Sequence, residues 1–133
     1  MTSLQDLIDR EEIRALTATY NRRFDDQDAD GWAALFVDDG ELEVVGGRTS
    51  RGGEELRAMC TTTGYGTVHI TCDSVIELDG DRATQVCTLL LARRSRDGGG
   101  NAFGLTGRYD DELIRTREGW RFRRRAITLD SPL

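Results

Sequence analysis

The only histidine of this sequence, His69, is the side chain best suited to acid–base chemistry near neutral pH. The ordinary pKa of a histidine lies close to neutrality, so the ring can take up and release a proton under mild conditions. His69 lies in a strand-like run over 67–72, far along the chain from a helical segment that ends near Asp25. A carboxylate that accepts one ring N–H fixes the tautomer and stabilises the imidazolium. The central question is therefore whether Asp25 contacts His69 in the fold.

The scarcity of other reactive side chains excludes several kinds of enzyme. One histidine cannot form a histidine-rich metal site, and Cys60, Cys72 and Cys87 lack the paired spacing of zinc ligands. We expect these cysteines to be buried free thiols, while a magnesium or calcium site made only of carboxylates stays open. All 18 basic residues are arginine, which excludes Schiff-base catalysis, pyridoxal phosphate attachment and a P-loop lysine. We therefore expect no cofactor and no bound metal.

Length and charge indicate a single domain that binds neither nucleic acid nor membranes. The 133 residues suffice for one hydrophobic core, so the domain is expected to span 1–133. The net charge of −6 argues against nucleic acid, and strand alternation divides the arginines at 121–125 between two faces. No apolar run approaches the roughly 18 residues of a membrane span, and the N-terminus lacks a secretion signal. The expected location is cytoplasmic.

Apolar periodicity predicts helices in the first half of the chain and strands in the second. Apolar residues recur three or four apart from Ser3 to Phe24, with Ser3 and Asp6 as a weak capping pair. From 67 onward, runs rich in Val, Ile, Leu and Thr are separated by turns that contain glycine. The expected helices span 3–24, 30–36 and 54–60, a short strand spans 42–45 and is followed by a loop over 46–53, and long strands span 67–78, 82–94, 102–117 and 120–129. This order predicts an α+β domain with helices packed on one face of a curved sheet around a cavity.

Several short motifs, taken in order, resemble the SnoaL-like branch of the nuclear transport factor 2-like superfamily. The motifs that carry the resemblance are Glu12-Ile13-Arg14-Ala15-Leu16, Tyr20, Asp25, Asp28, Leu35-Phe36, Asp38-Asp39-Gly40, Gly107-Arg108-Tyr109-Asp110-Asp111-Glu112-Leu113 and Gly119-Trp120-Arg121-Phe122. The resemblance covers nearly the whole chain. It implies a cone-shaped fold in which the N-terminal helices pack on a strongly curved antiparallel sheet that encloses a pocket. It also implies assembly into a homodimer or homotrimer.

The resemblance also implies a catalytic pair. Scytalone dehydratase, bile-acid dehydratase and hexachlorocyclohexane dehydrochlorinase place an aspartate at the end of the first helix against a histidine on the first long strand. Asp25 and His69 stand at these positions, and Tyr20 matches a tyrosine of the bile-acid enzyme. A further acidic residue of that enzyme has no counterpart in the apolar run over 89–92, which argues against a bile-acid substrate.

The residues alone leave alternatives open at each position. A single histidine on a strand is more often structural than catalytic, and alternation does not show which side of the strand faces the pocket. Asp26 or Asp28 could replace Asp25 as the partner of His69, and core packing is the alternative for the aromatic candidates. The residues considered for substrate binding are Tyr20, Trp32, Tyr65, Arg108 and Arg125.

The expected function is that of a cofactor-independent lyase or isomerase, such as a dehydratase, acting on a small and largely apolar metabolite. His69 is the expected general base and Asp25 the residue that orients it, in a domain that resembles polyketide cyclase-like proteins. Two other classes stay open, because fold alone does not define function. One is a non-catalytic protein that binds a small molecule, and the other is a structural subunit of an oxygenase complex.

Overall fold

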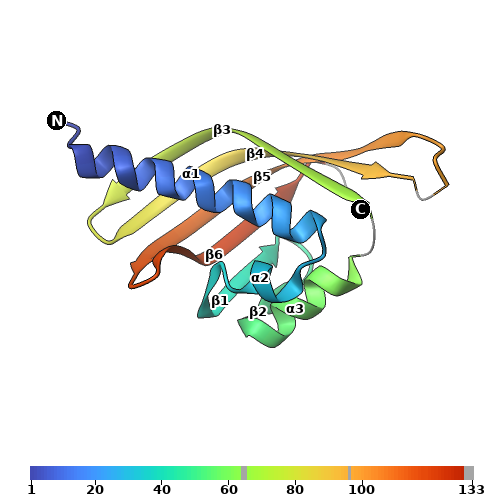
Figure 1. Ribbon diagram of the computed structural model, residues 1–133, viewed down its shortest axis with the longest axis horizontal. Coiled ribbons are helices and arrows are strands. Elements are labelled where there is room, and N and C mark those ends of the chain that lie inside the picture. Colours follow the sequence, from blue (N-terminus) through green and yellow to red (C-terminus); the bar gives the residue numbers. More distant parts are fainter. Residues whose placement is uncertain (64–65, 96, 131–133) are drawn as a thin grey trace.

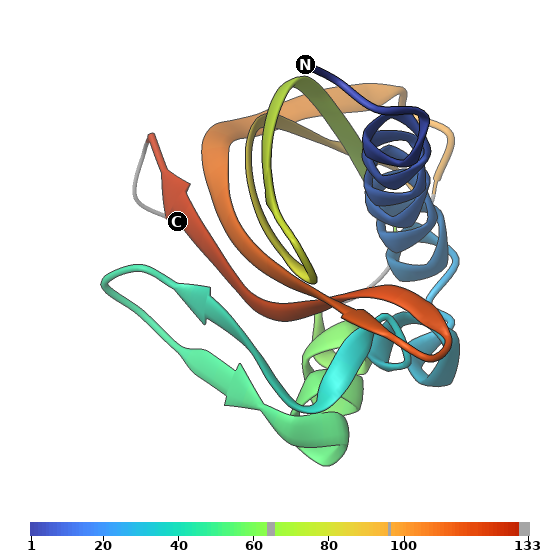
Figure 2. The same ribbon diagram turned by 90° about the vertical axis from the view of Figure 1, so that its left-hand side faces the viewer.

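A strongly curved sheet of six strands, with helices on its concave side, makes up the part of the chain that the structure describes (Figure 1). The computed structural model describes residues 1–63, 66–95 and 97–130. Its elements are α1 (Leu4–Asp25), α2 (Ala29–Ala33), β1 (Phe36–Val44), β2 (Thr49–Arg51), α3 (Gly52–Thr62), β3 (Thr67–Asp79), β4 (Arg82–Arg94), β5 (Asn101–Thr116) and β6 (Gly119–Leu129). The sheet curls around, and α1 lies across its open side (Figure 2). The expected α+β class is confirmed.

The sheet is mixed, whereas the sequence predicted an antiparallel one. Its strand order is β2-β1-β6-β5-β4-β3, and all neighbouring strands are antiparallel except β1 and β6. Parallel neighbours need a long crossover connection, and here the crossover contains α3 and three long strands. No local turn signal can mark such a pairing, so the parallel pair could not be predicted from the sequence.

Helix α1 begins and ends at well-defined caps. Ser3 and Asp6 exchange hydrogen bonds between side chain and backbone, as the capping pair predicted. At the other end, Gln27 adopts the left-handed conformation with φ 58°, and the Asp28 N–H donates to the Arg23 carbonyl. These contacts stop the helix just after Asp25 and set the position of that carboxylate.

The first turns of α1 differ from the expected apolar stripe. Leu4, Leu7 and Ile8 are exposed, whereas Ile13 and Leu16 are buried. The exposed residues belong to the N-terminal end of the helix, which lies at the end of the sheet (Figure 1). The apolar residues at helical spacing therefore extend to the N-terminal side of the part of α1 that packs on the core.

The segment after α1 contains less helix and more strand than its sequence indicated. A helix was predicted over 30–36, but α2 ends at Ala33 and β1 begins at Phe36. The backbone N–H of Phe122 in β6 donates to the Leu35 carbonyl, which holds this segment at the sheet. Strand β2 lies within the predicted loop over 46–53 and pairs with β1.

A buried carboxylate, Asp9, joins α1 to the strands β5 and β6. Its oxygens accept hydrogen bonds from Arg115 at 2.7 and 2.8 Å, from the Trp120 indole N–H at 3.2 Å and from Gln5 at 3.0 Å. The hydrogen bonds from Arg115 do most to hold the pKa of Asp9 well below its ordinary value, against the opposing effect of burial. A carboxyl group with a lowered pKa in the folded state stabilises the fold at any pH above its unfolded pKa.

Replacing Asp9 by asparagine is expected to lower the free energy of unfolding at neutral pH, because the amide lacks the charge that pairs with Arg115. The wild-type protein loses this contribution as the pH falls below about 4, the ordinary pKa of an aspartate, toward the lower pKa of the folded state. The difference in free energy of unfolding between wild type and variant, measured by urea unfolding, should therefore shrink from neutral to acidic pH. A gap of constant size over that range would contradict the prediction.

Candidate functional site

The last residue of α1 and the third residue of β3 meet at one point of the fold. One carboxylate oxygen of Asp25 lies 2.6 Å from Nδ1 of His69, and the other accepts the His69 backbone N–H at 2.8 Å. The Thr67 hydroxyl donates to the first oxygen at 3.0 Å. The side chains of His69 and Asp25 are only 8% and 15% exposed. Of the three aspartates considered as partners, Asp25 makes the contact, while Asp26 and Asp28 are exposed.

The alternation of side chains along β3 explains why the His69 ring faces inward. Thr67 and His69 lie on the same side of the strand, and both line an internal cavity. The imidazole packs edge-on against Phe24, with ring centroids 4.9 Å apart, and against Tyr20 at 6.4 Å. Asp25 occupies Nδ1, and within the described residues Nε2 has no hydrogen-bond partner. Nε2 is therefore the ring nitrogen that a ligand can reach.

An apolar cavity of about 250 Å³ lies beside the His69 ring. Its walls come from α1, β1, α3 and the long strands. Most of the strand side chains in these walls are aliphatic: Leu42, Leu89, Leu91, Leu105, Ile127 and Leu129. None of the described residues that line the cavity carries a carboxylate, and His69 contributes an imidazole to its wall. Such a cavity suits a small, largely apolar ligand.

Two tyrosines line the same cavity, Tyr20 on α1 and Tyr109 on β5. Their ring centroids are 6.0 Å apart. Burial raises the pKa of Tyr20 and raises that of Tyr109 well above its ordinary value. Both phenols are therefore protonated at neutral pH and can donate hydrogen bonds. Tyr20 was a predicted site residue, but Tyr109 was not. Tyr109 lies two residues before the buried Asp111, and both point to the inward side of β5.

Arg125 lies beneath these tyrosines rather than in the cavity wall. Its side chain is fully buried, and Nε donates to Asp111 at 2.8 Å. Its guanidinium carbon lies 3.5 Å from the ring centroid of Tyr109 and 4.3 Å from that of Tyr20. Arg125 was predicted to bind substrate, but the structure surrounds it with protein. It supports the floor of the cavity.

Two other predicted site residues, Trp32 and Arg108, do not line the cavity. Trp32 is fully buried among the rings of Tyr20 and Phe24, so it belongs to the core. Arg108 points to the opposite face of β5, where its side chain is 61% exposed and pairs with Asp110. Alternation along the strand explains this, because its neighbour Tyr109 points inward. Tyr65 lies outside the described residues.

The thiols give no sign of reactivity. Cys60 and Cys87 are buried, and burial raises the pKa of each to about 11. Cys72 is exposed, which corrects the expectation that all three thiols are buried. The residues that the structure describes contain no cluster of three or more histidine, cysteine or carboxylate side chains that could hold a metal. None of the described helices is long and apolar enough to span a membrane.

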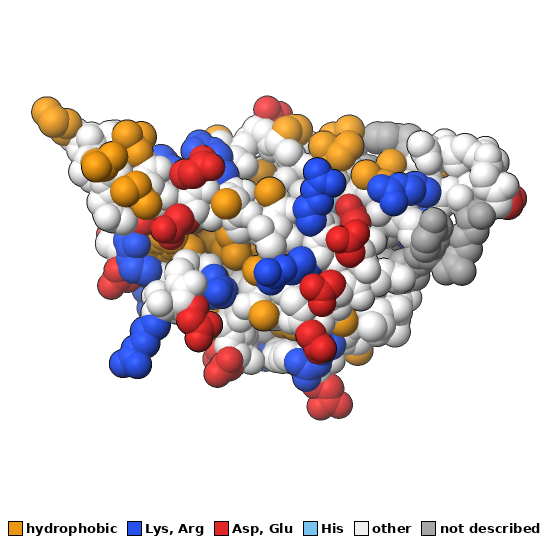
Figure 3. Space-filling model, viewed as in Figure 1, with side chains coloured by type: hydrophobic (Ala, Val, Ile, Leu, Met, Phe, Trp, Pro, Cys, Tyr) orange, Lys and Arg blue, Asp and Glu red, His pale blue; other side chains and the backbone are white. Residues whose placement is uncertain are grey.

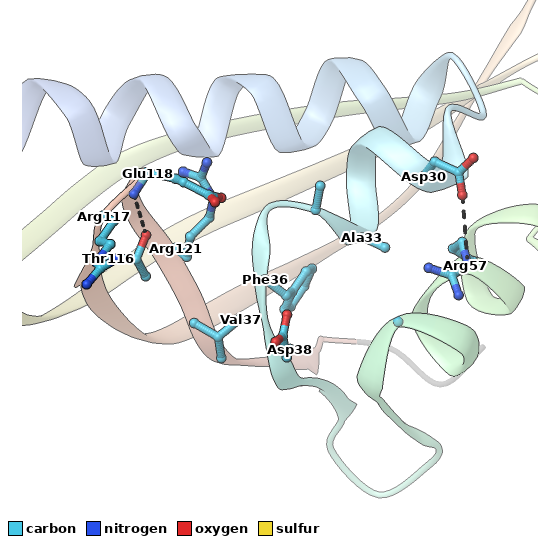
Figure 4. A pocket seen from close by; sticks show the side chains of 12 residues that line it. Asp30, Ala33, Phe36, Val37, Asp38, Arg57, Thr116, Arg117, Glu118 and Arg121 are labelled. Carbon is cyan, nitrogen blue, oxygen red and sulfur yellow. Dashed lines mark hydrogen bonds and ion pairs between the residues drawn. The ribbon is translucent and has the colours of Figure 1, made fainter.

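A larger hollow of about 770 Å³ lies elsewhere, on the outside of the domain. It lies between α2, α3 and the turn that joins β5 to β6, and its walls carry both acidic and basic side chains (Figure 4). Asp30 and Arg57 face one another across it at 3.8 Å. Acidic and basic side chains also mix over the face that α1 covers (Figure 3). That face therefore lacks the broad basic surface that nucleic acid requires.

Comparisons with known proteins give a family and a fold. Residues 5–126 match the family model described as a SnoaL-like domain. A Mycobacterium tuberculosis protein of unknown function is 30% identical, with a TM-score of 0.87, over 97% of this chain and 76% of that one. A nuclear transport factor 2-like protein with a cystatin-like fold from Novosphingobium aromaticivorans is also 30% identical, with a TM-score of 0.83, over 100% of this chain and 94% of that one.

A second protein of the same bacterium, named as a candidate scytalone dehydratase, is 21% identical. Its TM-score is 0.83, and the alignment covers 95% of this chain and 87% of that one. At this level of identity the likeness shows the fold alone. No curated protein matches the chain at a significant level.

Proposed function

Because this chain belongs to the SnoaL-like domain family, we propose that it is a cofactor-independent lyase or isomerase in which His69 acts as general base. The observation that carries the proposal is the 2.6 Å contact between Asp25 and Nδ1 of His69 at the wall of an apolar cavity. The carboxylate accepts a hydrogen bond from the N–H at Nδ1. Nε2 is then unprotonated, and its lone pair points toward the cavity. An isolated basic nitrogen beside an apolar space is suited to removing a proton from carbon.

The reaction begins with proton transfer from a carbon next to a carbonyl group to Nε2 of His69. The electron pair of the broken C–H bond moves into the carbonyl and forms an enolate, while Asp25 stabilises the imidazolium. The phenols of Tyr20 and Tyr109 interact with each other, so that Tyr109 donates to Tyr20 and the protonated Tyr20 phenol supplies a hydrogen bond to the enolate oxygen. The enolate then expels a hydroxide or halide from the neighbouring carbon, or takes the proton back at a different carbon. Expelled hydroxide leaves as water with the proton that His69 carries.

Deuterium exchange tests the first step without knowledge of the natural substrate. Small ketones with acidic C–H bonds, such as β-tetralone and indanone, are incubated with the protein in D₂O, and deuterium uptake is followed by mass spectrometry. We expect uptake above the buffer rate for at least one ketone that fits the cavity. We expect His69→Gln, which keeps a polar side chain of similar reach, to return uptake to the buffer rate. Equal uptake by wild type and variant would exclude His69 as the base.

A non-catalytic binding protein is the second candidate. The observation that supports it is that the cavity walls contain few polar groups, because a largely apolar cavity can bind a ligand without reacting with it. The same ketones separate the two functions. A binding protein shows affinity in calorimetry without deuterium uptake, and its affinity survives in the His69→Gln variant.

A further inference from the structure

A polar groove borders the Asp25–His69 pair on the side away from the apolar cavity. It runs between α1 and β3 and has a volume of about 510 Å³. His69 belongs to the walls of both the groove and the cavity. Three arginines, Arg14, Arg22 and Arg94, also line the groove. We call this space the arginine groove.

The helical period of α1 gives each space its own row of side chains. Tyr20 and Phe24 lie four residues apart and face the apolar cavity. The next row contains Asn21 and Asp25, which contact β3 through Thr71 and His69. The row after it contains Arg14, Ala18 and Arg22, which form the rim of the groove. Ala18 lies between the two arginines in this row.

The lining of the arginine groove carries a small excess of positive charge. Within the ranges that the structure describes, Arg14, Arg22 and Arg94 form no ion pair, whereas six other arginines do. Other described arginines, among them Arg117 and Arg121 of the outer hollow, also form no ion pair, so the balance of charge in each lining decides the comparison. Two carboxylates, Asp25 and the exposed Asp26, line the groove against the three arginines, so the lining carries one excess positive charge.

The larger outer hollow shows the contrast. There, Arg57, Arg117 and Arg121 are matched by Asp30, Asp38 and Glu118, and Arg57 pairs with Asp30 (Figure 4). That hollow therefore carries no excess of positive charge, although it is lined by the same number of arginines. The excess is a property of the arginine groove.

The groove also contains a buried polar atom without a partner. The amide nitrogen of Asn21 donates to the Thr71 hydroxyl at 3.0 Å, and its amide oxygen, which is buried, has no hydrogen-bond partner among the described residues. Because this oxygen is an acceptor, only a donor such as water or a hydroxyl group of a ligand can satisfy it, and an anionic oxygen cannot. Asn21 lies on the helix row between the cavity residues and the arginines.

We propose that the arginine groove binds an anionic group, a carboxylate or a phosphate, of a substrate whose apolar part occupies the cavity. This inference rests on the proposed function and adds the chemical class of the substrate. The two spaces adjoin at the start of β3, where Thr67 and Arg93 line the cavity while His69 and Arg94 line the groove. Because His69 belongs to both walls, a ligand bound at its ring can present a charged end to the arginines and an apolar end to the cavity.

A matched pair of fluorescent probes tests the groove. Anilinonaphthalene sulfonate and phenylnaphthylamine share the same rings and differ by one negative charge. We expect the sulfonate to bind more tightly at low ionic strength and to lose that advantage as salt is added. The double variant R14Q/R22Q should weaken sulfonate binding about fivefold, from the typical strength of two partly exposed charge pairs, and leave the neutral probe unchanged.

Two controls separate charge from fold. R14K/R22K keeps both positive charges and should retain most of the sulfonate affinity, and R117Q removes an arginine from the outer hollow and should change neither probe. Displacement of the sulfonate by naphthylacetate or by naphthyl phosphate supports the proposal, and the stronger competitor identifies the natural group. Equal affinity for both probes, or equal losses in R14Q/R22Q and R117Q, overturns it. These titrations measure binding alone, so they can succeed or fail independently of the deuterium exchange by His69.

Discussion

Asp25→Asn is expected to slow deuterium exchange by about 10²–10⁴-fold, the usual value of a well-placed general base, while the protein stays folded. The reason lies in the hydrogen bonds of the carboxylate. One oxygen of Asp25 accepts the backbone N–H of His69, so this atom must remain an oxygen in the variant. The amide nitrogen then takes the other position, 2.6 Å from Nδ1 in the wild type. An N–H that faces Nδ1 forces the ring proton onto Nε2, and Nε2 can no longer act as a base.

Asp26→Asn is the matched control, because it makes the same chemical change at the next residue. Asp26 is exposed and does not contact the imidazole, so the Asp26→Asn variant should catalyse deuterium exchange as fast as the wild type. Circular dichroism of both variants checks the fold, and proton NMR of the imidazole reports the tautomer. The proposal fails if Asp25→Asn exchanges as fast as Asp26→Asn, or if the Asp25→Asn ring keeps its proton on Nδ1.

The meeting of Asp25 with His69 shows what the sequence could and could not predict. The apolar period of α1 and the turn signals between the long strands placed each residue on its element correctly. From the residues alone, the pairing itself stayed open, because 44 positions separate the two residues and alternation leaves both sides of β3 possible. The structure resolves this through the cap at Gln27, which ends α1 where its last turn reaches the start of β3.

The parts of the fold that sequence reasoning missed depend on distant contacts. Strand β2 has only three residues, too few for an alternating pattern to emerge. The early end of α2 depends on β6, whose Phe122 N–H donates to the Leu35 carbonyl. Propensity at 30–36 favours a helix, and a hydrogen bond from the far end of the chain overrides it.

The sequence pattern did not identify the charged residues that are buried inside the sheet. An apolar pattern locates core positions by their hydrophobicity, so it does not identify an arginine that is buried with its counterion. Arg125 was considered for substrate binding because it is charged and lies in the last strand. The structure instead buries it completely, with Asp111 as its partner and the rings of Tyr20 and Tyr109 against its guanidinium.

Arg125→Met is expected to lower the free energy of unfolding by about 3–5 kcal/mol, the usual cost of removing one member of a buried ion pair. The variant leaves the Asp111 carboxylate in the core without its cation, and burial already raises the pKa of that group. Gln85 still donates to Asp111 at 2.9 Å, but one neutral donor does not replace a guanidinium. The rings of Tyr20 and Tyr109 also lose their stacked cation. Urea unfolding at neutral pH measures the loss.

The exposed pair Arg108–Asp110 on β5 provides the control within the same protein. Both pairs join an arginine to an aspartate, but Arg108 and Asp110 are 61% and 45% exposed, so Arg108→Gln should change the free energy of unfolding by less than about 1 kcal/mol. The double variant R125M/D111L should regain part of the loss of Arg125→Met, because it removes both buried charges. If Arg125→Met costs no more than Arg108→Gln, the buried pair does not stabilise the cavity floor. Its arginine would then have to be explained by some role other than stability.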